Sequence, residues 1–248
     1  MQNPDPGAPG RGAPLPGRTH FLFDLDGTLL DSRTVVVDAV AEGLTDAYRA
    51  CGLPPHDPDR DLIISAMGLP SDEYFRSSYP AHTVPTELRE EFSREYATAA
   101  SRAEVAALER GGSELFPGVE STLAELKSRG HILLLFSNSA SPYFEAVIRA
   151  HDLKRLFSRT LCLEAAARQG LADDKTGMVG ALAVDAEQVV VVGDRIHDIE
   201  AGKAAGALTV GCLHGFGDPA EFEAADWIVD GLAGLLDLPP AEASGVPK

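Results

Sequence analysis

The amino-acid sequence predicts an α/β protein, with an open parallel sheet, helices on both faces of the sheet and an inserted all-helical domain. Short segments rich in leucine and β-branched residues alternate with segments of helical periodicity, which is typical of parallel sheets. Two segments, 131–136 and 188–192, are almost continuously apolar, as strands covered on both faces require. The stretch from residue 34 to residue 112 shows helical spacing and no good strand. This stretch is therefore expected to form the inserted domain.

The elements of the sheet domain follow one another at short intervals. Strands are expected at 19–25, 131–136, 160–163, 188–192, 208–213 and 227–229. Helices are expected at 119–129, after Pro117-Gly118, at 143–150, after Ser141-Pro142, and at 196–205, before Gly206. Proline at the start of a helix and glycine at its end are common boundary signals.

The inserted stretch contains two one-sided apolar stripes at helical spacing. One stripe comprises Val36, Val40, Leu44 and Tyr48, and the other comprises Leu88, Phe92, Tyr96, Ala99 and Ala103. Such stripes indicate amphipathic helices. We therefore expect a helical cap at 33–114, and a catalytic core made of 19–32 and 115–238. The leader, 1–18, and the tail, 239–248, are rich in proline or small residues and are expected to be disordered.

Composition limits the classes of partner. The chain has 38 acidic and 21 basic residues and a net charge of −17, so a nucleic-acid partner is not expected. A small phosphate ester remains compatible, because a metal ion reverses the local field. Cys51, Cys162 and Cys212 have unrelated spacings, which argues against a disulfide framework or a zinc site. With no apolar run of membrane-spanning length and no signal-peptide core, we expect a cytoplasmic protein without a membrane partner.

Two acids at the end of the first strand carry most of the chemical information. Asp24 and Asp26 are one residue apart and precede Gly27, so both can address one ligand from the same face of an extended chain. Asp24 is a candidate nucleophile on phosphorus, and Asp26 a candidate general acid and base. Thr28 can bond to a nearby carboxylate or backbone group. The structural alternative is a turn with a helix cap.

Three further segments bear candidate groups. Ser137 and Asn138 end the apolar strand 131–136, where a hydroxyl and a backbone amide can hold a phosphoryl oxygen. Serine and asparagine are also common caps. Lys175 can offset negative charge, although its acidic neighbours in the sequence offer a simpler partner. Asp194 follows a valine-rich strand and Asp198 follows at i+4, which suits a Mg²⁺ site or, alternatively, a helix N-terminus.

Taken together and in this order, the segments resemble the haloacid dehalogenase superfamily, in particular members with a helical cap between the first two motifs and phosphoglycolate phosphatases among them. The resemblance implies a Rossmann-like core and a Mg²⁺-dependent phosphatase acting on a small phosphorylated metabolite. It implies that Asp24 is the phosphorylated nucleophile and Asp26 the acid/base. It further implies that Thr28, Ser137, the Asn138 amide and Lys175 hold the phosphoryl group. The implied metal ligands are Asp24, the Asp26 carbonyl, Asp194 and Asp198.

The chain departs from the family pattern near Lys175. Relatives with this cap usually show proline after the lysine and a longer helix before the fourth motif, whereas here Thr176 follows. Three alternatives stay open. A sugar-phosphate mutase shares the four motifs, and a dehalogenase shares the fold but needs neither Asp26 nor Asp198. A phosphoacceptor signalling module gathers similar groups around Mg²⁺ but lacks a large cap. Arg76 is a candidate partner for a substrate carboxylate, or an exposed surface residue.

Overall fold

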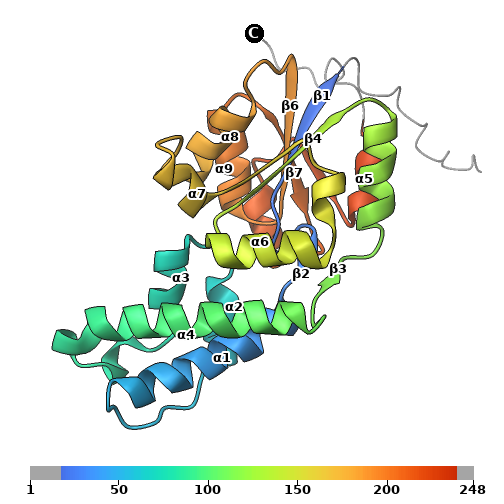
Figure 1. Ribbon diagram of the computed structural model, residues 1–248. Helices are drawn as coiled ribbons and strands as arrows, with labels where there is room; N and C mark the ends of the chain where they lie inside the picture. The colour runs from blue at the N-terminus through green and yellow to red at the C-terminus, as the bar shows by residue number, and fades with distance from the viewer. Residues whose placement is uncertain (1–17, 239–248) are drawn as a thin grey trace, which may run out of the picture.

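The computed structural model describes residues 18–238. The tail predicted at 239–248 and the leader predicted at 1–18, apart from Arg18, lie outside the described residues. The described chain forms a sheet domain and a helical insertion, which lie at opposite ends of the molecule in Figure 1. The α/β fold class is as predicted.

Six parallel strands form the central sheet. Their spatial order is β5 (Arg159–Cys162), β4 (Ile132–Ser137), β1 (Thr19–Phe23), β6 (Gln188–Gly193), β7 (Leu208–Cys212) and β8 (Trp227–Val229). Each strand begins and ends within two residues of its predicted position. The central position of β1 is important, because Ser137 ends its neighbour β4 and Asp194 directly follows its neighbour β6.

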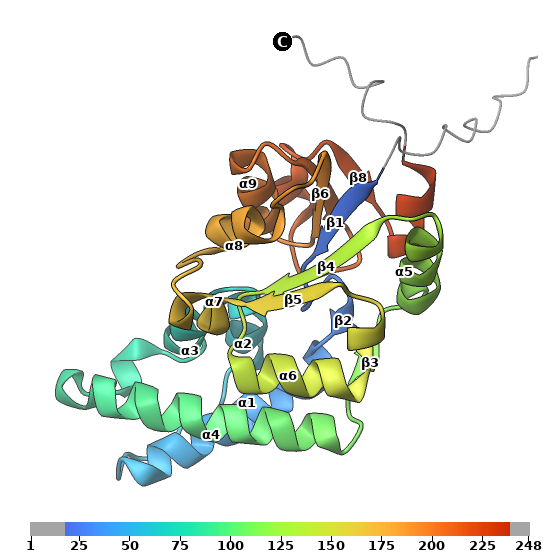
Figure 2. The ribbon, with the colours of Figure 1, turned by 45° about the horizontal axis from the view of Figure 1, so that its top comes forward.

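Helices cover both faces of this sheet (Figures 1 and 2). Successive side chains of a strand point to opposite faces, so Phe21 and Phe23 pack on one side and Leu22 on the other. The side of Phe21 and Phe23 is covered by α5 (Val119–Ser128) and α6 (Ser141–Ala150), and that of Leu22 by α7 (Leu163–Arg168), α8 (Lys175–Leu182) and α9 (Ile196–Ala204). The helices α7 and α8 were not predicted from the sequence, because they are too short to show a clear apolar period.

The insertion consists of α1 (Arg33–Ala50), α2 (Arg60–Ala66), α3 (Ser71–Ser77) and α4 (Arg89–Glu109), with 3-10 turns at Ala81–Thr83 and Thr86–Leu88. The long helices α1 and α4 lie side by side in Figures 1 and 2. A Cβ atom at Gly43 would lie 2.4 Å from the Ala100 backbone nitrogen, so this glycine permits the close approach of the two helices. Most residues of the two predicted stripes are buried; Leu88 and Ala103 are partly exposed.

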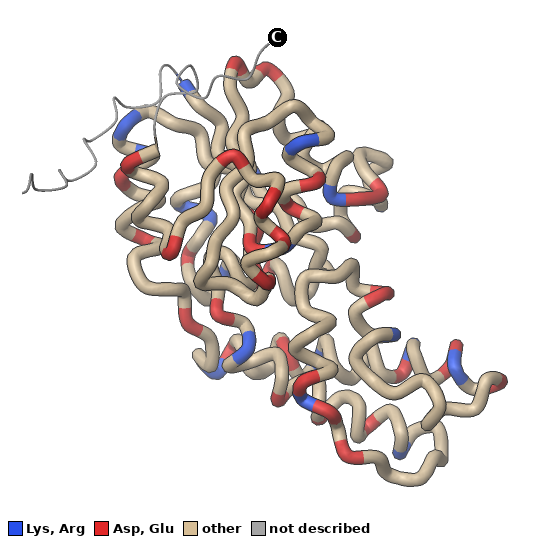
Figure 3. Tube along the Cα trace, turned by 180° about the vertical axis from the view of Figure 1, so that it is seen from behind, with Lys and Arg blue, Asp and Glu red and all other residues tan. Residues whose placement is uncertain are grey.

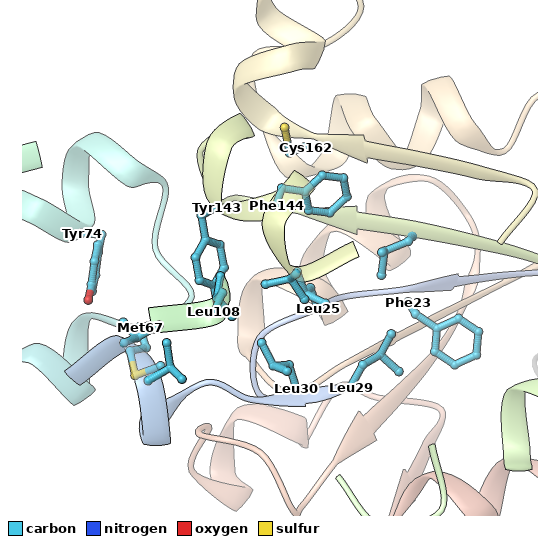
Figure 4. Close-up of a cluster of buried hydrophobic side chains, with 14 of the residues drawn as sticks. Phe23, Leu25, Leu29, Leu30, Met67, Tyr74, Leu108, Tyr143, Phe144 and Cys162 are labelled. Atoms are coloured by element: carbon cyan, nitrogen blue, oxygen red, sulfur yellow. The ribbon is translucent and has the colours of Figure 1, made fainter. Parts of the chain in front are cut away.

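A small antiparallel pair joins the insertion to the sheet domain. It consists of β2 (Leu30–Asp31) and β3 (Glu114–Leu115), so the two connections between the parts run next to each other. Two-residue strands give no periodic signal, and the sequence did not reveal them. One apolar cluster continues through this junction, from Phe23 and Leu25 beside the sheet to Met67 and Tyr74 in the insertion (Figure 4). The insertion is therefore packed against the sheet domain near the end of β1.

The acidic residues and the cysteines complete the description of the fold. Acidic positions are spread over both the sheet domain and the insertion (Figure 3). Cys51, Cys162 and Cys212 are free thiols. Within residues 18–238, none of the helices has the length and apolar character needed to cross a membrane.

Candidate active site

Three adjacent strands deliver polar residues to one edge of the sheet. Asp24 follows β1, Ser137 ends β4 and Asp194 follows β6. Phe23 of β1 is in register with Leu135 on one side and Val192 on the other, so these strands reach the edge together. The Asp24 amide continues the ladder by donating to the Val192 carbonyl at 2.9 Å. In open α/β sheets this carboxyl edge is where ligands bind.

An acidic cluster forms at this edge from two distant parts of the chain. Asp24, Asp194 and Asp198 are buried, and each offers a carboxylate oxygen that lies within 4.8 Å of the others. Asp198 stands in the first turn of α9, and its Oδ2 accepts a hydrogen bond from the Arg195 amide at 3.0 Å. The same carboxylate thus caps the helix, as one interpretation of the sequence expected, and belongs to the acidic cluster.

Lys175 is the basic residue of this cluster. Its Nζ lies 2.7 Å from Asp24 Oδ1 and 2.7 Å from Asp198 Oδ1, and its side chain is only 7% exposed. Its neighbour Asp174 does not pair with it, because Asp174 instead caps α8 by accepting from the Gly177 amide at 2.7 Å. Burial alone would lower the pKa of Lys175, but the carboxylates of Asp198 and Asp24 outweigh burial and raise it. The amine therefore stays protonated.

One lysine does not balance three buried carboxylates. Burial raises the pKa of Asp24 well above its usual range, Lys175 opposes this shift, and the other two acids add to it. Burial and then Asp198 raise the pKa of Asp194 to about 7. The surplus of negative charge and the set of hard oxygen donors fit a divalent cation, and Mg²⁺ binds through few carboxylates of this kind.

Asp194 is held from several sides. Thr28 Oγ1 donates to Asp194 Oδ1 at 2.9 Å, and the Phe216 amide donates to Oδ2 at 2.8 Å. Gly27 has φ +83°, and a Cβ atom there would lie 2.1 Å from Asp194 Oδ2, so only glycine leaves room for the carboxylate. Thr28 is completely buried. The Thr28 hydroxyl thus bonds to a carboxylate, which is one of the partners expected from the sequence alone. The family resemblance instead implies a contact with the phosphoryl group.

Asp26 faces a different environment from Asp24. It is partly exposed, and its Oδ1 accepts a hydrogen bond from the Tyr143 hydroxyl at 2.5 Å. Burial raises the pKa of Asp26, and the Tyr143 hydrogen bond lowers it in part. Sequence reasoning missed Tyr143 as a site residue. The available signal was its place in the first turn of α6, which directly follows the polar segment after β4.

The Ser137–Asn138 segment lies beside Asp26 and reaches the insertion. Ser137 Oγ accepts from the Ser139 amide at 3.1 Å and donates to Ser139 Oγ at 2.9 Å. Asn138 Nδ2 donates to the Gly68 carbonyl at 3.0 Å, in the loop between α2 and α3. The structure thus brings both residues to the site, and the Asn138 side chain links the two parts of the molecule.

A cavity opens between the acidic cluster and the insertion. Asp24, Asp26, Ser137 and Asn138 line its sheet-domain side, while Met67, Tyr74 and Glu104 are among the residues that line it from the insertion. Four predicted residues are buried and do not line the cavity: Thr28, Lys175, Asp194 and Asp198. Neither Glu104 nor Tyr74 was identified from the sequence. Nothing in the sequence pattern of α4 or α3 distinguishes these two residues from other residues of a helix.

Comparison with known proteins places this geometry in a family. A family model described as haloacid dehalogenase-like hydrolase matches residues 19–206. The phosphoglycolate phosphatase of Vibrio cholerae is 30% identical, covering 88% of this chain and 95% of the relative. That of Photorhabdus laumondii is 28% identical, covering 90% and 92%. The crystal structure of a predicted phosphoglycolate phosphatase from Haemophilus somnus superposes with a TM-score of 0.70 at 25% identity, covering 88% and 96%.

Proposed function

The chain belongs to the haloacid dehalogenase-like hydrolases, and on this premise we propose that it is a Mg²⁺-dependent phosphatase that cleaves a small phosphate monoester through a phosphorylated Asp24. The observation that carries the proposal is the meeting of Asp24 with Lys175 and two further acids beside a cavity. Relatives named phosphoglycolate phosphatases support the phosphatase class. The match to a hydrolase family favours water as the phosphoryl acceptor over the second sugar hydroxyl that a mutase would use.

The proposed reaction has two steps. In the first, a carboxylate oxygen of Asp24 attacks phosphorus, the bond to the ester oxygen breaks, and Asp26 gives its proton to the departing alcohol. In the second, Asp26 takes a proton from water, whose oxygen attacks phosphorus and releases inorganic phosphate and free Asp24. The different surroundings of the two acids support this division, since Asp24 contacts Lys175 and Asp26 contacts a neutral tyrosine.

The remaining residues position these groups. Asp24, Asp194, Asp198 and the Asp26 carbonyl would hold Mg²⁺, which supplies positive charge to the transferring phosphoryl group. Lys175 contacts Asp24 and opposes the rise in its pKa, which favours the ionised nucleophile. Thr28 holds Asp194 in place, and Ser137 with the Asn138 amide would receive a phosphoryl oxygen. The insertion, as a cap, would exclude bulk water and contact the alcohol part of the substrate.

Phosphate release with and without metal tests the proposal. The protein is freed of metal with a chelator and offered p-nitrophenyl phosphate, phosphoglycolate and a hexose 1-phosphate. We expect repeated turnover in Mg²⁺ and a loss of at least about 100-fold in EDTA, because a metal contributes several kcal/mol to charge stabilisation. Equal rates in EDTA would contradict the metal role. An isomerised hexose phosphate without free phosphate would point to a mutase, and one turnover followed by a long-lived phosphoprotein to a signalling module.

Tyr143→Phe tests the positioning of Asp26. The variant removes the hydroxyl that donates to Asp26, and we expect kcat to fall about 10-fold, the size of one lost hydrogen bond to a charged group. This bond lowers the pKa of Asp26, so its loss raises that pKa. The alkaline limb of the pH profile, where the protonated acid is lost, should therefore move to higher pH. An unchanged limb with a lower rate would leave Tyr143 with a packing role only.

A further inference from the structure

The cavity beside the acidic cluster has a second end that the proposed chemistry does not use. Asp24 and Asp26 mark the end where the phosphoryl group would react. The opposite side is formed by the insertion, through Tyr74 of α3 and Ser101 and Glu104 of α4. A substrate phosphorylated at the first end would place its alcohol part against the second. The side chains on this side therefore indicate which chemical group the alcohol part of the substrate carries.

Glu104 is the carboxylic acid among the described residues that line the cavity from the insertion. Its side chain is only 6% exposed although it lines the cavity. Within the described part of the chain, no lysine, arginine or histidine forms an ion pair with it. Burial, and then the charge of Asp26, raises the pKa of Glu104 to about 8. A buried acid at a cavity wall without a cation is costly unless a ligand supplies one.

Two other polar groups of the cavity lack partners. The Tyr74 hydroxyl and the Asn138 Oδ1 atom are buried, and neither makes a hydrogen bond to the described residues. Asn138 already uses its amide nitrogen on the Gly68 carbonyl, so its free atom can only accept. The ionised Glu104 carboxylate also only accepts, whereas the Tyr74 hydroxyl can accept or donate. Such a lining favours a ligand that brings hydrogen-bond donors.

The same lining is unsuited to a second negative charge. None of the described residues that line the cavity is lysine, arginine or histidine. Arg76, the candidate partner for a substrate carboxylate, is exposed on α3 and does not line the cavity. Arg195 pairs with Glu221 and donates to the Met67 carbonyl. A protonated Glu104 can donate one hydrogen bond to a carboxylate, but it leaves the charge of that carboxylate without compensation near Asp26.

We propose that the alcohol part of the substrate carries an ammonium group that pairs with Glu104, so that the enzyme acts on small phosphorylated amines in preference to phosphorylated carboxylic acids. This inference rests on the proposed phosphatase function and specifies its substrate class. An ammonium group brings one positive charge and three donors, which match the Glu104 carboxylate, Asn138 Oδ1 and the acceptor side of the Tyr74 hydroxyl. A carboxylate of similar size would meet acceptors and a second acid.

Four phosphate esters that differ only at the far end of a two-carbon alcohol test this inference. They are 2-aminoethyl phosphate, 2-hydroxyethyl phosphate, ethyl phosphate and phosphoglycolate. For the wild-type enzyme in Mg²⁺, we expect kcat/KM to be highest for the amine and lowest for phosphoglycolate. A preference for phosphoglycolate or for the hydroxyl ester over the amine would overturn the inference while leaving the phosphatase function intact. Release of no phosphate from any of these esters or from p-nitrophenyl phosphate would overturn the proposed function, and the inference with it.

Glu104→Gln assigns the preference to one side chain. Glutamine keeps the shape of glutamate and one acceptor oxygen but not its charge, so we expect the ratio of kcat/KM for amine over phosphoglycolate to fall about 10- to 100-fold, as for a lost charge-assisted hydrogen bond. The change should fall mainly on KM for the amine. Glu91→Gln, at an exposed site in the first turn of the same helix, is the matched control and should keep the wild-type ratio. An unchanged ratio in Glu104→Gln would overturn the assignment.

Discussion

Replacing Asp24 by asparagine is expected to reduce phosphate release by at least about 10⁴-fold, because the variant lacks the carboxylate that would attack phosphorus and nucleophile removal typically costs this much or more. The site around it should remain assembled. Lys175 keeps its contact with Asp198, and the position 24 amide still pairs with the Val192 carbonyl. The measurement is steady-state phosphate release in Mg²⁺, with the ester that the wild-type enzyme uses best.

The stability of this variant separates a catalytic role from a structural one. The pKa of Asp24 is raised in the folded protein, so its ionisation disfavours folding, and this cost grows as the pH rises from the unfolded pKa towards the folded pKa. Asparagine cannot ionise, and the melting temperature of Asp24→Asn at pH 8 should therefore be no lower than that of the wild type. Asp230→Asn, at an exposed position, is the matched control and should keep full activity. Turnover retained by Asp24→Asn would refute Asp24 as the nucleophile.

Replacing Lys175 by methionine should produce the largest loss of stability. Methionine preserves much of the apolar stem but leaves Asp24 and Asp198 buried without the amine that lies 2.7 Å from each. Breaking a buried pair by removing one partner typically costs about 3–5 kcal/mol. For a domain of this size, each kcal/mol lowers Tm by about 2–4 °C. Thermal unfolding at pH 8 without metal measures the effect, and activity should be lost with it.

Two comparisons identify the cause of this loss. Lys203→Met breaks a partly exposed pair with Asp226, in which the lysine is 39% exposed, and should cost at most about 1 kcal/mol. The double variant Lys175→Met/Asp24→Asn should be less destabilised than the sum of its single variants, because fewer unpaired charges remain. The penalty should also shrink as the pH falls and the acids become protonated. Equal losses of stability in Lys175→Met and Lys203→Met would show that burial of the Lys175 ion pairs does not increase their contribution to stability.

The sheet could be predicted from the sequence because its signals are local. Runs such as the valines of 189–192 have one compatible environment, a strand covered on both faces, and the polar residues that follow them must then lie at the strand ends. The helices α1 and α4 could be predicted from their apolar stripes for the same reason. The short helices α7 and α8 and the two-residue strands β2 and β3 were not. Contacts with the rest of the fold stabilise such short elements, and a local pattern does not record those contacts.

The functional residues divide in the same way. The sequence by itself determined that Asp24, Ser137 and Asp194 come to one edge, because each directly follows or ends a strand of a parallel sheet and parallel strands share a carboxyl edge. Asp26 comes to the same edge because it stands two residues after Asp24. Only the tertiary structure decided that the Thr28 hydroxyl contacts Asp194, that Tyr143 donates to Asp26 and that Glu104 lines the cavity. These contacts join residues far apart in the chain. Side-chain direction and helix packing fix them, whereas spacing along the chain constrains only residues that share one element.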